Sequence, residues 1–260
     1  MQPGSYFAGF DLVTAALYGF WVFFLGLILY LNRESKREGY PLVTPGKPND
    51  RPQGFPGVPT PKIFKLAHGG TAQAPRNDGD PQPPIAAVWA DPTPGAPLVP
   101  TGNPMIDGVG PAAYALRADV PDLTFDESLP KIVPLRVATD VAIDPEDPDP
   151  RGMTVVDADW QPAGICVDIW YDKSEAIFRF LEVEVATEMG FRRVMIPVPM
   201  MTINSARNVI RVRSLLAEHF KTAPTLKNPD TITLLEEDKV AAYCAGGQFY
   251  AKRERSEPWI

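Results

Sequence analysis

The sequence has few of the residues on which cross-linking and metal binding depend. It contains two cysteines, Cys166 and Cys244, and two histidines, His68 and His219, among 260 residues. Two cysteines exclude a disulfide framework, and no CxxC pair or His–carboxylate spacing suggests zinc. Neither a GxGxxG nor a GxxxxGK loop is present, so no nucleotide site is expected. A net charge of −7 argues against nucleic-acid binding.

Catalytic machinery is also scarce. A Ser/His/Asp triad would need His68, in the turn-like LAHGG, or His219, in the amphipathic LLAEHFK, where a packing or surface role is usual. Cys166, in an expected strand, and Cys244, in an expected helix, are interpreted as structural thiols. A hydrolase would require a nucleophile and a base that are not found. We therefore expect a non-catalytic chain that holds no metal and no cofactor of its own.

Charge is absent from one long apolar run, Leu12 to Asn32. As a helix this run would rise about 31 Å, the thickness of the bilayer hydrocarbon core. A cleaved signal peptide would need a basic leader and a shorter run, so we predict a retained transmembrane helix over residues 12–32. Positive charges follow the run and none precedes it, which places residues 1–11 outside and the bulk of the chain in the cytoplasm. Lipid contact is expected at the inner interface, at Tyr30, Asn32 and Arg33.

Proline is concentrated in the next part of the chain, residues 33–150. Of the 30 prolines, 23 lie between Pro41 and Pro150, a density that argues against helix and central strand. Apolar residues such as Phe64, Trp89 and Met105 are interleaved throughout, so we expect an ordered, extended segment that lies across a partner surface. A short hairpin is predicted around Ile63 to Ala74, and a compact loop over 101–123.

Short strands with alternating polarity dominate residues 151–250. From Gly164, the alternation places Ile165, Val167 and Ile169 on one face and Cys166, Asp168 and Trp170 on the other. FRFLEVEVA alternates in the same way, and RRVMIPVPMMTI and NVIRVRSLL follow, joined by a turn at 204–208. Pro197 and Pro199 are expected at an edge or bulge.

The end of this domain is predicted as a strand, TITLLEED (231–238), and a helix, DKVAAYCAGG, that stops at Gly246 and Gly247. The fold class is thus a single N-terminal transmembrane helix followed by a mainly-β cytoplasmic domain. That domain is a small antiparallel β-barrel with an extended proline-rich segment and a short C-terminal helix. Residues 251–260 form a tail.

Carboxylates are the remaining candidates for chemistry. Asp168, Asp172 and Glu175 lie within eight residues, Glu182 and Glu184 follow on the next strand, and Glu236, Glu237 and Asp238 lie near the carboxyl end. Such clusters are usually a solvated face. They can also form a proton-conducting chain when burial or like charges raise carboxyl pKa values. Spacing alone leaves both interpretations open.

Several segments, in order, resemble the H subunit of the purple-bacterial photosynthetic reaction centre, a PRC-barrel family. They are FDLVTAALYGFWVFFLGLILYLNRESKREGYPL, PKIFKLAHG, PTGNPMIDGVGPAAY, VDIWYDKSEAIFRFLEVEV and TLLEEDKVAAYCAGGQFYA. REGYPL after the apolar run and LLEEDK near the end are the most specific of these. The resemblance covers nearly the whole chain.

The resemblance implies an accessory subunit of a light-driven electron-transfer complex in the chromatophore or inner membrane, with a periplasmic amino terminus. Its partners would be the L and M subunits, membrane lipids, the light-harvesting antenna and a cytochrome subunit. Bacteriochlorophyll, bacteriopheophytin, quinones, non-haem iron and carotenoid would be bound by partners. The chain would cap the cytoplasmic face of L and M, stabilise the complex and shield the quinone sites.

The resemblance also implies a part in proton delivery to the secondary quinone. The positions that match the family route are Asp172, Glu175 and Arg179, with Glu175 as the inner, desolvated group and Asp172 farther out. Asp168, on the same acidic strand, is a further candidate. The alternative is a membrane-tethered assembly scaffold with no proton-conducting role, in which neutralising these carboxylates would leave quinone turnover unchanged.

One stretch departs from the family pattern. Members carry two histidines beside an aspartate where protons enter and transition metals bind, but here DLTFDESLPK (122–131) contains no histidine. Asp122, Asp126 and Glu127 are the candidates for proton entry in their place. Carboxylates alone suit hard cations better than zinc, so no metal site is expected here.

Overall fold

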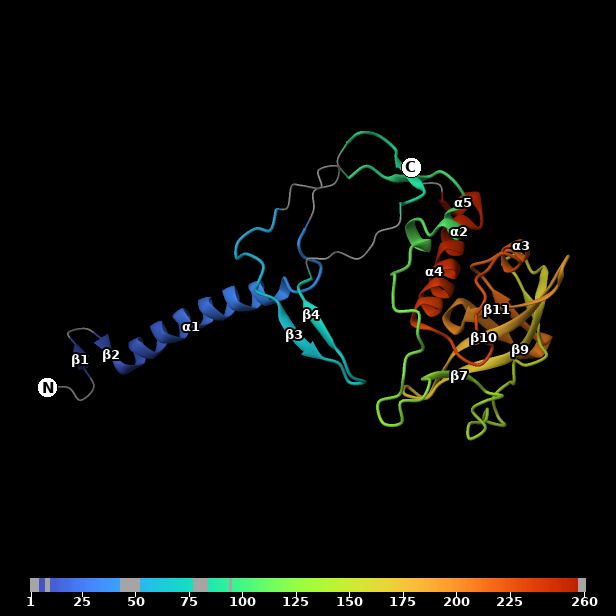
Figure 1. The fold of residues 1–260 in the computed structure, drawn as a ribbon, viewed down its shortest axis with the longest axis horizontal. Coiled ribbons are helices and arrows are strands. Elements are labelled where there is room, and N and C mark those ends of the chain that lie inside the picture. The colour runs from blue at the N-terminus through green and yellow to red at the C-terminus, as the bar shows by residue number, and fades with distance from the viewer. Residues whose placement is uncertain (1–4, 8–9, 43–51, 77–83, 94, 257–260) are drawn as a thin grey trace. The chain divides into compact units, whose positions relative to one another are not determined.

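The structure is a computed structural model that describes residues 5–7, 10–42, 52–76, 84–93 and 95–256. Parts of three predicted segments lie outside these residues: the amino terminus at 1–4 and 8–9, the proline-rich segment at 43–51, 77–83 and 94, and the tail at 257–260. The chain divides into two compact units, Met1–Pro81 and Gln82–Ile260 (Figure 1).

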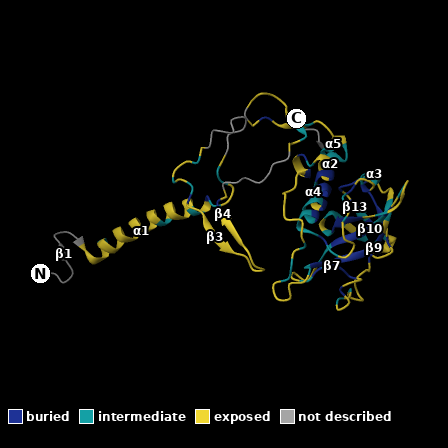
Figure 2. Ribbon diagram, viewed as in Figure 1, coloured by how far each residue is buried: buried dark blue, intermediate teal, exposed yellow. Residues whose placement is uncertain are grey.

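The first unit is built around α1, Leu12–Ser35, preceded by the short strands β1 (Ser5–Phe7) and β2 (Phe10–Asp11). Asp11 caps the helix, because its side chain accepts the Thr14 N–H at 2.7 Å. No residue of α1 is buried within the chain (Figure 2). In the described part of the chain, α1 alone has the length and hydropathy to cross a membrane. The predicted helix is confirmed and continues three residues past Asn32.

The predicted hairpin around Ile63 to Ala74 is also confirmed. Strands β3 (Lys62–Lys65) and β4 (Thr71–Ala74) pair antiparallel, with Lys62 opposite Ala74 and Lys65 opposite Thr71. A two-stranded sheet of this length has no interior of its own.

The second unit begins with irregular chain that carries short elements. Strands β5 (Ala87–Trp89) and β6 (Leu98–Pro100) form a hairpin, followed by α2 (Pro104–Asp107) and the 3₁₀ turn η1 (Gly110–Ala112). The expectation that proline excludes helix here was wrong for α2. Pro104 stands at the first helical turn, where its missing N–H costs no hydrogen bond, and Asn103 caps the turn.

One curled sheet of seven strands forms the body of the second unit. It comprises β7 (Ile132–Pro134), β8 (Thr154–Val156), β9 (Pro162–Asp172), β10 (Ile177–Thr187), β11 (Gly190–Pro197), β12 (Met201–Asn204) and β13 (Val209–Val212). The order is β11-β10-β9-β8-β13-β12, with β7 also paired to β9. The pairing is antiparallel except between β13 and β8. The mainly-β, barrel-like class is confirmed.

Prolines and turns lie where the strand pattern predicted them. Pro197 ends the edge strand β11, and Pro199 lies in the 3₁₀ turn η2 (Val198–Met200). The turn η3 (Ser205–Arg207) joins β12 to β13. Strand β7 lies in the proline-rich segment, ahead of residue 151. The sheet therefore includes a strand from outside residues 151–250, where the strands were predicted.

The predicted faces of β9 were wrong at its amino-terminal half. A register shift opposite Val167 changes the alternation, so Cys166 packs in the same core as Ile169, while Ile165 is exposed. The alternation of β10 is confirmed, since Leu181 and its partners on that face are in this core. A second core cluster, which includes Trp170 and Phe180, lies against Val240.

The predicted strand over 231–238 was wrong, and so was a helix end at the two glycines. Helix α4 runs over Leu234–Tyr250 and starts with a capping box between Thr233 and Glu236. It continues through Gly246 and Gly247 because both allow close packing. A Cβ on Gly246 would lie 2.6 Å from the Ala112 Cβ. The short helices α3 (Ala217–Phe220) and α5 (Arg253–Ser256) complete the unit.

Candidate functional site

An acid–base cluster lies where β9 turns into β10. Asp172 ends β9, and its Oδ1 accepts the backbone N–H groups of Ser174 and Glu175 at 2.9 and 3.0 Å. Its Oδ2 accepts from Arg179 Nε at 3.1 Å and lies 3.6 Å from Lys131 Nζ. The turn residue Glu175 contacts the same two cations: Oε1 lies 2.9 Å from Arg179 Nη2 and 3.6 Å from Lys131 Nζ. Two carboxylates thus share two cations.

The two cations of this cluster, Lys131 and Arg179, line a cavity of about 510 Å³, whereas Asp172 and Glu175 do not line it. Asp122, 3.9 Å from Lys131 Nζ, lines the cavity, as do Arg179 and Phe178. Glu237 of α4 also lines it, and burial raises the pKa of this carboxyl, against the opposing effect of nearby arginines. The cavity therefore has ionisable groups from three separate parts of the chain on its walls.

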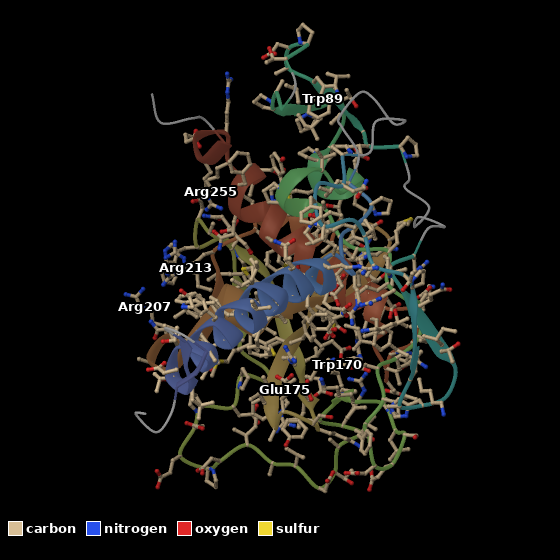
Figure 3. The ribbon with its side chains drawn as sticks, turned by 90° about the vertical axis from the view of Figure 1, so that its left-hand side faces the viewer. Trp89, Trp170, Glu175, Arg207, Arg213 and Arg255 are labelled. Carbon is tan, nitrogen blue, oxygen red and sulfur yellow. The ribbon has the colours of Figure 1, made fainter. Side chains whose placement is uncertain are left out.

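Asp172 and Glu175 differ in their burial within the chain, and the inner position that the resemblance implies for Glu175 in the complex stays a prediction. The Asp172 side chain is 0% exposed, whereas that of Glu175 is 49% exposed, near the turn end of the β9–β10 hairpin (Figure 3). Glu175 could therefore become an inner group only when a partner covers it. Arg179 contacts both carboxylates, so the structure brings these three predicted residues together.

Asp168 belongs to a different cluster, built on the other part of the same strands. Arg136 Nη1 lies 2.8 Å from Asp168 Oδ2 and 2.7 Å from Glu182 Oε2. Arg193 Nη1 and Trp170 Nε1 donate to Glu182 as well, at 3.0 and 3.1 Å. Both carboxylate side chains are almost fully buried, at 7% and 3% exposure. Each oxygen has a donor, which is the arrangement of a structural network.

The three residues predicted for proton entry are separated. Asp122 lines the cavity, whereas Asp126 and Glu127 lie on an exposed turn and do not line it. At the end of α1, Tyr30, Asn32 and Arg33 are exposed, as lipid contact would require, and that contact stays a prediction. Among the described residues, no group of three or more His, Cys, Asp or Glu side chains could hold a metal ion.

The cysteines and His219 occupy buried or half-buried positions. Burial raises the pKa of the Cys166 and Cys244 thiols to about 12, so neither is a thiolate near neutral pH. His219 Nδ1 accepts the Leu216 N–H at 3.1 Å, and burial lowers the pKa of its imidazole. These contacts fit the packing roles that the sequence predicts.

Sequence reasoning missed Lys131, Arg136 and Arg117; Arg117 lines the cavity, and its Nη1 lies 3.7 Å from Glu237 Oε1. Lys131 and Arg136 flank β7, and the pairing of Ile132 with Asp172 brings Lys131 to the cluster. The isolated basic residues in a proline-rich stretch gave no local signal for this pairing. The LLEED sequence that carries Glu237 indicates an acidic cluster, but it does not predict that Glu237 lines this cavity.

A comparison with protein families gives one match over half of the chain. The model of the photosynthetic reaction centre H-chain, N-terminal region, matches residues 4–137. The match includes α1, residues 33–137 of the proline-rich segment and β7, and so extends from the candidate span to the strand that Lys131 and Arg136 flank. The chain therefore belongs to the photosynthetic reaction centre H-chain family.

Proposed function

We propose that this chain caps the cytoplasmic face of the L and M subunits, stabilises their complex and shields the quinone sites. Membership of the H-chain family and the candidate span α1 support this proposal. The cations Arg33, Lys36 and Arg37 at the end of α1 favour a periplasmic amino terminus and a cytoplasmic second unit. The pigments, the quinones and the iron would be held by partners, in a chromatophore or inner membrane that also carries the antenna and a cytochrome.

The proposal includes proton delivery to the secondary quinone, and the charged cavity is the observation that carries it. Reduction of a quinone to a quinol consumes two protons for every two electrons. A shielded quinone site excludes bulk water, so protons must reach it through fixed acids and ordered water. Asp122, Asp172 and Glu175 lie 3.6–3.9 Å from Lys131 Nζ, and Asp122 and Lys131 line a cavity large enough for water.

Each residue of the cluster has a distinct part in this proposal. Asp122 lines the cavity and Glu175 does not, but each side chain is 49% exposed, so both carboxylates can exchange protons with water. Asp172 fixes the turn and, with Arg179, orients Glu175. Glu175 Oε1 would pass protons to the partner side, where a covering subunit would desolvate it.

The test is Glu175→Gln in the assembled reaction centre. The amide keeps the size of the side chain but cannot carry the proton, so we expect slower proton-coupled transfer of the second electron to the quinone. Glu146→Gln, on an exposed loop away from the cavity, is the matched control and should be unchanged. Pigment absorption spectra report assembly. Normal spectra with unchanged kinetics would remove Glu175 from the route.

The scaffold alternative has its own supporting observation. Lys131, which directly precedes β7, contacts both Asp172 and Glu175 and so links β7 to the β9–β10 turn, which would give the cluster a structural use without any proton flow. A pure scaffold predicts that truncating the second unit lowers the yield of the complex, while neutralising Asp122 or Glu175 leaves quinone turnover unchanged.

A further inference from the structure

The β3–β4 hairpin exposes apolar side chains on both faces. In the chain, Ile63 is 72% exposed on one face, and Phe64 and Leu66 are 46% and 52% exposed on the other. An isolated two-stranded hairpin is marginally stable in water, and exposed side chains of this kind add nothing to its stability. The hairpin therefore needs a surface to cover it.

The root of the hairpin is fastened to the end of α1 by ionic contacts. Arg37 Nη1 donates to the Thr60 and Ala74 carbonyls, on the two sides of the root, at 2.9 and 3.1 Å. The same guanidinium pairs with Glu34, which also contacts Lys62 Nζ at 2.7 Å. The hairpin is thus fixed to the last turn of the membrane helix.

These contacts set the depth of the hairpin if α1 spans the bilayer. The charge-free run ends at Asn32, and Arg37, two residues past the end of α1, follows it by at most about 7.5 Å at the helical rise of 1.5 Å per residue. The headgroup layer on each side of the hydrocarbon core is roughly 5–7.5 Å thick. The root of the hairpin therefore lies at the outer edge of the lipid headgroups.

The charge of this region selects the kind of surface. The described residues of 33–76 contain the cations Arg33, Lys36, Arg37, Lys62, Lys65 and Arg76 against the acids Glu34 and Glu38. Lys36 is buried and donates to the Gln53 and Pro56 carbonyls, and Arg37 and Lys62 pair with Glu34. This local excess of positive charge contrasts with the net charge of −7 for the whole chain. Basic side chains beside exposed Phe and Ile are typical of peptide segments that bind anionic membrane surfaces.

We propose that the β3–β4 hairpin is a second membrane anchor, which inserts Ile63, Phe64 and Leu66 at the headgroup level of a bilayer rich in anionic phospholipid. A partner protein surface is the competing occupant. The proposal goes beyond the capping and proton-delivery functions and depends only on α1 crossing the membrane. Its failure would leave the Glu175 prediction intact, because that residue is in the other unit.

The test uses nitroxide labels on single introduced cysteines, since both native thiols are buried and have a pKa near 12. Ile63→Cys and Ala72→Cys probe the hairpin, and Val22→Cys in α1 is the depth reference. The assembled complex is placed in vesicles of phosphatidylcholine with or without phosphatidylglycerol. Collision of the label with oxygen, which partitions into lipid, is compared with collision with a water-soluble nickel chelate.

We expect the hairpin labels to lose nickel accessibility and gain oxygen accessibility in the vesicles that contain phosphatidylglycerol. Lys65→Gln should weaken this shift. Labels that stay as accessible to nickel as in free solution would overturn the proposal. Labels that are shielded from both reagents whatever the lipid would also overturn it and would assign the hairpin to a protein partner.

Discussion

Removing Arg136 tests whether the buried network holds the second unit together. The Arg136 guanidinium is the cation that joins Asp168 to Glu182, and it also donates to the Pro229 carbonyl. In Arg136→Met the methionine preserves much of the aliphatic stem. Asp168 loses its cation, and Glu182 keeps only Arg193 and the Trp170 indole. Two carboxylates would then remain buried with one cation.

The expected cost follows from the burial of the carboxylates. Breaking a fully buried ion pair by removing one partner costs about 3–5 kcal/mol, because an uncompensated charge stays in the interior. The Arg136 side chain is itself 33% exposed, and Arg193 still contacts Glu182, so solvent and the second cation offset part of this cost. We expect a loss of about 2–3 kcal/mol in the free energy of unfolding of the second unit.

The assay is urea unfolding of the full chain in mild detergent, followed by far-ultraviolet circular dichroism of the sheet. Arg151→Met is the control, because Arg151 pairs with Asp149 at 2.6 Å with both side chains nearly half exposed. That change should cost less than about 1 kcal/mol. Adding Asp168→Asn and Glu182→Gln to Arg136→Met should recover stability, since no buried charge remains. Equal midpoints for the Arg136 and Arg151 variants would refute the reasoning.

Two further predictions concern packing and pH. Gly247→Ala should destabilise the second unit by about 1–3 kcal/mol, because the new Cβ would lie 2.5 Å from the Ser214 carbonyl oxygen. Thermal unfolding of the chain measures this loss, and an unchanged midpoint would contradict the prediction. His219 has its pKa lowered from 6.5 by burial, so the folded state resists its protonation and stability should fall as pH drops below 6.5. His219→Gln should lose that slope in unfolding curves measured between pH 7 and 5, and a slope equal to that of the unaltered chain would exclude His219 as its source.

The sequence predicts α1 and strand β10 well because each is governed by a local pattern. A charge-free run of bilayer length is compatible with few structures other than a long helix, and a strict alternation over β10 with few other than a strand. The helix predicted within α4 is confirmed, but its start was missed because TITLLEED resembles a strand, whereas the Thr233–Glu236 capping box sets the helix start. Its path through Gly247 depends on a close approach to Ser214, which only the folded structure shows.

The site was predicted in part for the same reason. Asp172, Glu175 and Arg179 lie within eight residues on one hairpin, so the turn itself brings them together. Lys131 reaches them only because β7 pairs with β9, a contact between segments about forty residues apart. The pairing of β7 with β9 also covers Asp172, at the end of β9, and leaves Glu175 in the turn more exposed. The sequence does not show this pairing, so it does not predict that Asp172 is the more buried of the two.

The double use of the Asp172 carboxylate bears on how mutants of this region are interpreted. One of its oxygens accepts the amides that shape the turn, and the other meets Arg179 and Lys131. An asparagine there would disturb the geometry that presents Glu175 at the same time as it removes a titrating group. Slow kinetics in such a variant could come from a displaced Glu175 or from the loss of the Asp172 proton carrier. A change at Glu175, whose side chain shapes no backbone, tests the proton carrier alone.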